Sequence, residues 1–369
     1  MRASALEKSW LMPAGADPSE NRAGVGHRSA IARLLVTGAA WVVLFIAVTG
    51  AAQSAEKLSV RLDWITEPMH MPFFLAEERG WFKAADLDVS IEDGNGSTMT
   101  VQLVGAGRFD IGLADLSPMA IGKARGIPIV SIAGFIRRGG VGFVVPKSIQ
   151  IASLADFIGK EIFYTTSSFE GPFVEPLFRS NGVLFERINL VNMDASAKIP
   201  TYLSGRGDAM ITTVPPNLVI AAGKRDSYGV LFADHGFNLP SFGLVARPDT
   251  LRTRAAAVRR FASVIASAWT YILAAPDHAI DSARATLAYR PMSPLPLNTM
   301  VAQMESYRPY FYTKATADMP IGLQADADWE IAITNMEAAK VIAPGSRPAD
   351  YYTNNMIDLS FGKKIVGLP

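Results

Sequence analysis

Short runs of apolar and β-branched residues alternate along the chain with stretches whose apolar positions recur every three or four residues. These patterns predict strands at 60–64, 87–91, 110–114 and 127–133, and helices at 71–79 and 98–104. Gly80 directly follows the first helix, and glycine is the usual residue at a left-handed helix end. Strands that alternate with helices indicate an α/β protein.

The clearest helical pattern runs from 255 to 275. Its apolar residues fall at spacings of three and four and form one continuous face: Val258, Phe261, Ile265, Ala268 and Ile272. We expect this helix to contribute packing and no chemistry.

A short internal similarity predicts two related halves. Residues 103–110 read LVGAGRFD and residues 203–208 read LSGRGD, and an apolar strand pattern follows each. Both describe a helix end, a glycine-rich turn with an aspartate, and a buried strand. Two similar α/β lobes explain the similarity, and coincidence is the alternative for so short a repeat.

Two extended segments mark where the chain would pass between these lobes. Val141–Val145 ends at Pro146, and Phe242–Ala246 ends just before Pro248. The sequence therefore predicts a two-strand hinge. Lobe 1 would comprise 56–145 plus 247–369, and lobe 2 would comprise 146–246.

The first 55 residues predict a presequence with a signal peptide. Arg28 and Arg33 precede an apolar run, Leu34–Val48, and small residues follow at 50–55. Basic, apolar and small segments in this order are typical of secretion signals. We expect cleavage and a periplasmic mature protein.

An uncleaved membrane anchor is the alternative reading of that segment. The apolar run could extend to Ala52. Even then it is shorter than the roughly 20 residues that cross a bilayer comfortably, so cleavage is favoured.

Composition excludes several classes of function. The formal net charge is +1, so no overall field would attract nucleic acid or a membrane surface. The chain has no cysteine, which excludes disulfides, a thiolate nucleophile, a cysteine zinc site and a lipid-anchored cysteine. Its four histidines are scattered, so we predict no metal site, although carboxylates alone could hold calcium.

Known catalytic and cofactor motifs are missing from the sequence. It contains no G-x-S-x-G, no Walker loop, no G-x-G-x-x-G and no H-E-x-x-H. We therefore predict no catalytic residues, no cofactor and a binding function.

Candidate ligand contacts follow from the predicted strand ends. Ligands of open α/β sheets bind outside the carboxyl ends of the strands, beside helix N-termini. The polar, glycine and aromatic residues at these positions are Asp63, Trp64, His70, Asn95, Gly96, Ser97, Asp115, Ser117, Ser168, Glu175 and Thr213.

Each of these residues also has a purely structural reading. Trp64 could stack on a planar ring or belong to the core. His70 could bind a ligand or cap the following helix, and Ser97 is an ordinary helix-capping residue. Glu175 lies one turn inside a predicted helix, where a solvated glutamate is the usual case.

Several short motifs in one order resemble a known family. They are Leu62-Asp63-Trp64, Pro68-x-His70, Glu78–Phe82, Gly107-x-x-Asp110-x-Gly112 and Ala124–Ile129. This order resembles substrate-binding proteins of ABC importers related to thiamine pyrimidine-precursor binding, which have sulfonate-binding and riboflavin-type relatives. The resemblance extends from about Lys57 to Ala274.

The resemblance implies a type II periplasmic-binding-protein fold, in which two α/β lobes close on a ligand. It implies that Trp64 stacks on a pyrimidine ring, with Asp63, His70 and Glu175 as polar partners. The implied partners are a small molecule and the permease and ATPase of the importer. The turn at 165–169 departs from the glycine-rich turn of the family. Fungal relatives are synthases that need cysteines, which this chain lacks.

The residue types at the strand ends bear on the charge of the ligand. Asp63, Asp115 and Glu175 are hydrogen-bond acceptors, which favour a neutral or cationic nitrogen heterocycle. Hydroxyls such as Ser97 and Ser168, placed at helix N-termini, keep a sulfonate or another small anion as the alternative. A membrane-anchored solute sensor is a second alternative, and it would need the uncleaved anchor.

Overall fold

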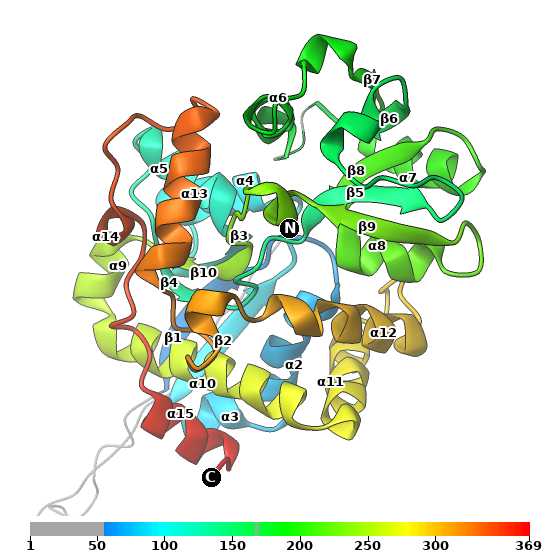
Figure 1. Ribbon diagram of the computed structural model, residues 1–369. Helices are drawn as coiled ribbons and strands as arrows, with labels where there is room; N and C mark the ends of the chain where they lie inside the picture. The colour runs from blue at the N-terminus through cyan, green and yellow to red at the C-terminus, as the bar shows by residue number, and fades with distance from the viewer. Residues whose placement is uncertain (1–54, 167, 169) are drawn as a thin grey trace, which may run out of the picture. The chain divides into compact units, whose positions relative to one another are not determined.

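The computed structural model describes residues 55–166, 168 and 170–369 (Figure 1). The predicted presequence and its apolar segment lie outside these residues. Within the described part, no helix combines the length and apolarity needed to cross a bilayer. The strands form two separate five-stranded sheets with helices around them, which confirms the α/β fold class.

The first sheet has the order β2-β1-β3-β10-β4. Its strands are β1 (Glu56–Arg61), β2 (Leu87–Glu92), β3 (Ile111–Asp115), β4 (Val130–Gly134) and β10 (Phe242–Ala246). β1 pairs in parallel with β2 and β3, whereas β10 runs antiparallel between β3 and β4. The four strands predicted in the N-terminal part of this sheet are confirmed, with ends shifted by a few residues.

The second sheet has the order β7-β6-β8-β5-β9. Its strands are β5 (Val141–Pro146), β6 (Glu161–Tyr164), β7 (Asn189–Asn192), β8 (Ala209–Thr213) and β9 (Ser227–Leu231). β6 pairs in parallel with β7 and β8, and β5 runs antiparallel between β8 and β9. The parallel and antiparallel neighbours repeat the pattern of the first sheet.

The predicted lobe boundaries need correction at both crossings. β5 was predicted in lobe 1 but belongs to the second sheet. β10 was predicted in lobe 2 but belongs to the first sheet. The chain crosses between the sheets in segments 135–140 and 237–241, where Gly139 donates its backbone N–H to Asn238 Oδ1 at 2.8 Å. The prolines after both strands were misleading, because pairing partners decide which sheet a strand joins.

Helices surround both sheets (Figure 1). Those before β10 are η1 (Pro68–His70), α2 (Met71–Glu78), α3 (Trp81–Ala84), α4 (Ser97–Gly105), α5 (Leu116–Ala124), η2 (Leu154–Phe157), α6 (Gly171–Ser180), η3 (Phe185–Arg187), α7 (Ala195–Leu203), α8 (Val214–Ala221) and η4 (Phe232–His235). Those after β10 are α9 (Pro248–Thr253), α10 (Ala255–Ala274), α11 (Pro276–Tyr289), α12 (Leu297–Tyr307), η5 (Arg308–Tyr310), η6 (Lys314–Thr316), α13 (Asp326–Ala338), α14 (Pro348–Tyr351) and α15 (Leu359–Val366).

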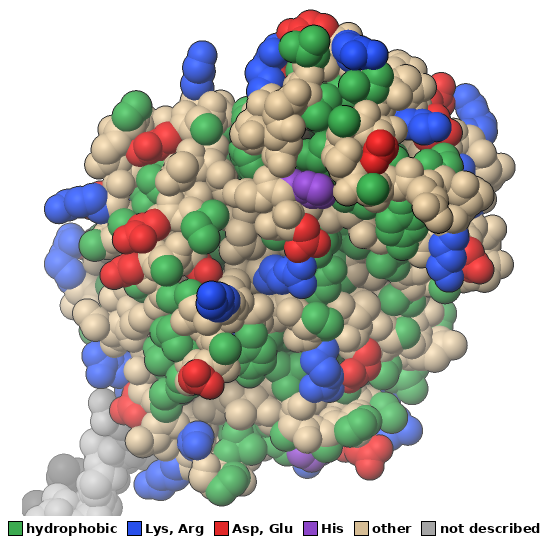
Figure 2. All heavy atoms as spheres, viewed as in Figure 1, with side chains coloured by type: hydrophobic (Ala, Val, Ile, Leu, Met, Phe, Trp, Pro, Cys, Tyr) green, Lys and Arg blue, Asp and Glu red, His purple; other side chains and the backbone are tan. Residues whose placement is uncertain are grey.

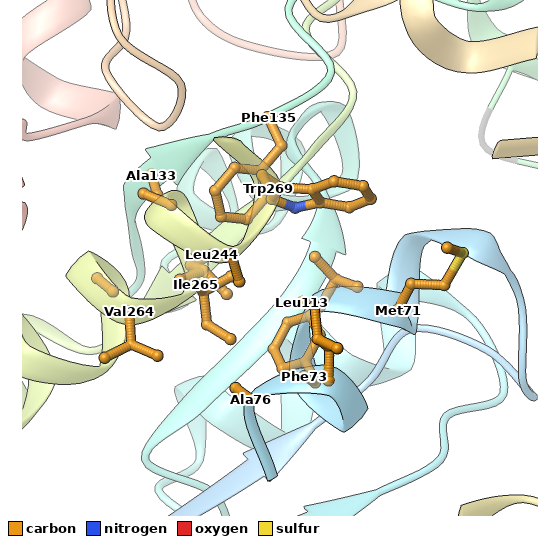
Figure 3. Packing of buried hydrophobic residues seen from close by; sticks show 14 of the residues in the cluster. Met71, Phe73, Ala76, Leu113, Ala133, Phe135, Leu244, Val264, Ile265 and Trp269 are labelled. Atoms are coloured by element: carbon orange, nitrogen blue, oxygen red, sulfur yellow. The ribbon is translucent and has the colours of Figure 1, made fainter. Parts of the chain in front are cut away.

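α10 is the predicted packing helix, and it covers one face of the first sheet (Figure 3). All five of its predicted apolar residues are buried. The Phe261 ring stacks on Phe82, with ring centroids 5.5 Å apart, and also contacts Phe73. Ile265 and Trp269 pack toward Leu244 of β10 and toward Phe135, which directly follows β4. The helix therefore packs the α2–α3 region against β10 and the end of β4.

Arg137 fastens the first crossing segment to the C-terminal part of the chain. Its side chain is buried and donates to the backbone carbonyls of Phe311, at 2.7 Å, and Leu323, at 2.8 Å. Burial lowers the pKa of Arg137 to about 10, which still leaves it charged at neutral pH. Arg137 is not among the predicted residues, because nothing in its local sequence pattern indicates a buried arginine.

We predict that Phe261→Ala lowers the free energy of unfolding by about 3–5 kcal/mol, because it removes a ring enclosed by other rings and leaves a cavity. Urea denaturation of the described part, residues 55–369, measures this loss. Ile331→Ala is the control, since 45% of Ile331 is exposed and its truncation removes little packing. Equal losses for the two variants would contradict the assignment.

Candidate ligand-binding site

Asp63 and His70 form a buried hydrogen-bonded pair after β1. His70 Nε2 lies 3.0 Å from Asp63 Oδ1, and His70 is fully buried. The Nδ1 atom of His70 accepts the backbone N–H of Glu67 at 3.2 Å, so the proton of a neutral ring lies on Nε2. His70 therefore donates to Asp63 and also caps the turn that begins η1. The prediction that the His70 side chain caps the following helix is wrong, since α2 receives no side-chain cap from it.

Glu67 was not among the predicted site residues, yet its carboxyl group points into this cluster. Its Oε1 atom is buried and has no hydrogen-bond partner. Burial, together with the nearby charge of Asp63, raises the pKa of Glu67 well above its ordinary value. A signal was available in the sequence: Glu67 lies three residues after Trp64 on the same connection.

The side chains of Asp63, Glu67 and His70 are close enough to be considered as a metal site. One ligand atom from each lies within 4.8 Å of the others. A metal at Nε2 would require the ring proton on Nδ1, where it would oppose the Glu67 N–H. The hydrogen bonding thus favours a proton-bearing His70 over a metal ligand.

Asp115, at the end of β3, is the second buried acid of the region. Its Oδ1 accepts the Ser117 N–H at 3.1 Å, and its Oδ2 accepts the Ser241 hydroxyl at 2.7 Å. Burial raises the pKa of Asp115 to about 7, although these hydrogen bonds act in the opposite direction. The Ser97 hydroxyl accepts the Asp115 N–H at 3.0 Å, so Ser97 links α4 to the end of β3 and does not cap its own helix as predicted.

No basic side chain balances these acids. Among the residues that the structure describes, no Lys or Arg forms an ion pair with Asp63, Glu67 or Asp115. Tyr307 of α12 is buried beside them, and its pKa is raised by burial and then by the charges of Glu67, Asp63 and Asp115. The region is therefore rich in acceptors and attracts a donor or a cation.

Trp64 is exposed at the surface of this region, with 48% of its area accessible. This excludes the core reading. The loop that supports it is tight: Gly94 donates to the Trp64 carbonyl at 3.0 Å, and Gly96 donates to the Asp63 carbonyl at 2.6 Å. A side chain at Gly96 would reach the indole ring, and the φ of +125° at Gly96 favours glycine. Asn95 is exposed and accepts a hydrogen bond from Arg61 at 3.5 Å.

Of the predicted second-lobe residues, Ser168 follows β6, Thr213 ends β8 and Glu175 lies on α6. Ser168 donates to the Thr165 carbonyl at 2.6 Å, and Thr213 precedes α8. Glu175 is exposed on α6 and pairs with Arg179 at 2.7 Å, as a solvated helical glutamate does. In the described part, no hydrogen bond or ion pair joins these three to the residues after β1 and β3.

A buried ion pair in the second lobe was also missed. Lys198 Nζ of α7 lies 3.6 Å from Glu170 Oε1, which directly precedes α6, and both side chains are less than a tenth exposed. Burial lowers the pKa of Lys198, and Glu170 partly counteracts this. The pair is internally neutral, so it changes the charge of the second lobe little.

Of two cavities in the described part, the smaller one lies at the site and the wider one does not. One of about 10 Å³ is lined by Asp115, Ser117 and Ser241, and is about the volume that one water needs. The Ser117 hydroxyl is buried nearby without a hydrogen-bond partner. A wider cavity of about 560 Å³ is lined by Arg138, Lys314 and other residues, none of which is a predicted site residue.

The distribution of surface charge agrees with the composition. On the face that Figure 2 shows, Lys and Arg side chains are scattered among Asp and Glu and do not gather into one basic patch.

Comparisons with known proteins define the class. Residues 67–279 match the model of the family described as NMT1/THI5 like, and the chain belongs to this family. The fold is that of periplasmic binding proteins. The periplasmic aliphatic sulphonate binding protein of Escherichia coli aligns with a TM-score of 0.60 at 14% identity, over 78% of this chain and 86% of that protein.

Two kinds of curated relative have different functions. The formylaminopyrimidine-binding protein of Halalkalibacterium halodurans is 24% identical over 297 residues, which are 78% of this chain and 86% of the relative. A 4-amino-5-hydroxymethyl-2-methylpyrimidine phosphate synthase of Saccharomyces cerevisiae is 32% identical over 112 residues, which are only 30% of this chain and 33% of the synthase.

We predict that the raised pKa of Asp115 makes stability depend on pH. Between about pH 4 and pH 7 the folded protein keeps a proton that the unfolded chain releases, so the free energy of unfolding contributed by Asp115 falls as pH rises. Asp115→Asn removes this titration. Relative to wild type, the variant should gain up to roughly 4 kcal/mol across that interval.

Urea denaturation at several pH values measures the difference. Asp318→Asn, an exposed change just after η6, is the control and should follow the wild-type pH dependence. A constant difference between Asp115→Asn and wild type from pH 4 to pH 7 would contradict the prediction.

Proposed function

We propose that this chain is the periplasmic ligand-binding component of an ABC importer for a small planar nitrogen heterocycle, similar to a thiamine pyrimidine precursor. Its partners would be the ligand and the permease and ATPase of the transporter. The proposal includes export with cleavage of the signal peptide and no catalysis.

One observation carries this proposal: the exposed Trp64 directly follows the buried Asp63, and no Lys or Arg among the described residues forms an ion pair with this acid or with Asp115. Trp64 offers a flat surface for a ring. Asp63 and Asp115 are buried nearby, and each aspartate is within electrostatic reach of the other. A heterocycle with ring nitrogens and an amine fits a stacking surface beside acceptors, whereas a sulfonate would be repelled by them.

The two sheets support a binding mechanism of lobe closure. In both sheets, parallel strands end near predicted ligand residues. Two crossing segments connect the two sheets. A ligand that contacts both lobes would shift an equilibrium between open and closed forms. The transporter would then bind the closed form.

The relatives and the composition together favour binding over catalysis. The formylaminopyrimidine-binding relative aligns along most of both chains, whereas the synthase aligns over about a third of its own length. The absence of cysteine from the sequence also separates this chain from synthases of the kind that the resemblance describes.

A thermal-shift screen of residues 55–369 tests the function. Pyrimidines, flavins, alkylsulfonates and aromatic acids are the probes. We expect 4-amino-5-hydroxymethyl-2-methylpyrimidine or a close analogue to raise the melting temperature, because a ligand that binds only the native state stabilises it. Stabilisation by alkylsulfonates alone would contradict the proposal, and so would turnover of a bound pyrimidine.

Trp64→Ala should weaken binding of the stabilising pyrimidine by about 1–3 kcal/mol, the range for a large aromatic anchor. Isothermal titration calorimetry measures the affinity, and the tryptophan fluorescence of wild type should change on ligand addition. Ile65→Ala is the matched control. Ile65 neighbours Trp64 and is 50% exposed, but its aliphatic side chain cannot stack on a ring. Unchanged affinity in Trp64→Ala would show that the indole of Trp64 does not contact the ligand.

A further inference from the structure

We propose that Glu67 is a specificity-determining residue of this ligand site and that its carboxyl group pairs with the amidine edge of an aminopyrimidine. That edge consists of a ring nitrogen next to an exocyclic amine. The inference rests on the proposed function and adds to it the feature that the ligand must carry.

Glu67 differs from the other two acids in its hydrogen bonding. Asp63 Oδ1 is paired with His70, and both oxygens of Asp115 have donors. The Oε1 atom of Glu67 is buried without any partner. An unpaired buried acceptor costs free energy, so this oxygen gains the most from a ligand that supplies a donor.

The position of Glu67 suits contact with a ring held by Trp64. Both residues lie on the connection from Leu62 to Glu67, which has no helix or strand. Glu67 as a whole is only partly buried, and the proposed pairing requires its side chain to rotate toward the ligand.

The environment of Glu67 also favours its protonated form. The titratable groups around it are Asp63, His70 of η1 and Tyr307 of α12, and Asp63 also interacts with Asp115 of β3. None of these is a lysine or arginine. Burial and the Asp63 charge raise the pKa of Glu67, which makes its carboxyl group a donor as well as an acceptor.

A carboxylic acid matches an amidine edge with two hydrogen bonds. The carboxyl O–H donates to the ring nitrogen, and the exocyclic amine donates to the carboxyl C=O. Transfer of the shared proton to the ring gives a pyrimidinium and a carboxylate, with no net proton gained or lost. Above the pKa of Glu67 the proton is missing, and the two lone pairs repel each other.

The experiment measures affinity for 4-amino-5-hydroxymethyl-2-methylpyrimidine by calorimetry from about pH 6 to about pH 9.5. This range includes the pKa values of known buried glutamates. Wild type should lose about tenfold in affinity across the upper part of this range. Glu67→Gln should bind with less pH dependence, because an amide also donates to the ring nitrogen and accepts from the amine without titrating. Asp115 titrates equally in both proteins.

Two further variants complete the test. Glu67→Leu should weaken binding about ten- to a hundredfold at every pH, because it removes both hydrogen bonds. Glu78→Gln, on the exposed face of α2, should match wild type. An analogue with hydrogen in place of the exocyclic amine keeps only the hydrogen bond to the ring nitrogen, so its affinity should differ less between wild type and Glu67→Leu than that of the aminopyrimidine does.

The outcomes separate this inference from the proposed function. If wild type binds the pyrimidine but Glu67→Gln and Glu67→Leu behave like wild type, Glu67 has no role and the function stands. If binding requires a divalent ion and is lost with EDTA, a metal occupies the acidic cluster and the pairing is overturned. If no pyrimidine binds to wild type, the proposed function itself fails.

Discussion

Strand β10 is the constraint on which the rest of the structure depends. It brings the chain back from the second sheet and runs antiparallel between β3 and β4, with all five residues buried. Every backbone group in such a central strand needs a partner, so the strand can occupy only one register. This insertion fixes both crossing segments and gives the first lobe its mixed sheet.

The same strand also assembles the acidic region. Ser241 directly precedes β10, accepts the Leu116 N–H on its backbone carbonyl and donates its hydroxyl to Asp115. Asp115 in turn lies within the field of Asp63 at the end of β1. Three elements from distant parts of the chain thereby bury carboxyl groups together, which costs stability at neutral pH and creates an affinity for donors.

The C-terminal helices hold this arrangement from outside. Arg137 binds carbonyls of the segment after α12, and Tyr307 of α12 packs beside the acids. α10 meanwhile connects α2 and α3 with the sheet through Phe261. The candidate site is therefore supported by packing on the first lobe, while Ser168, Glu175 and Thr213 of the second lobe form no hydrogen bond or ion pair with it in the described part.

The sequence by itself determined the α/β class, the α10 packing face and the placement of Asp63, Trp64, His70 and Asp115 at strand ends. These follow from local periodicity and from the rule that strand ends meet at one edge. Only the tertiary structure decided the sheet of β5 and β10, the exposure of Trp64 and the buried, unpaired oxygen of Glu67. Strand pairing and desolvation depend on residues far apart in the chain, which no local pattern records.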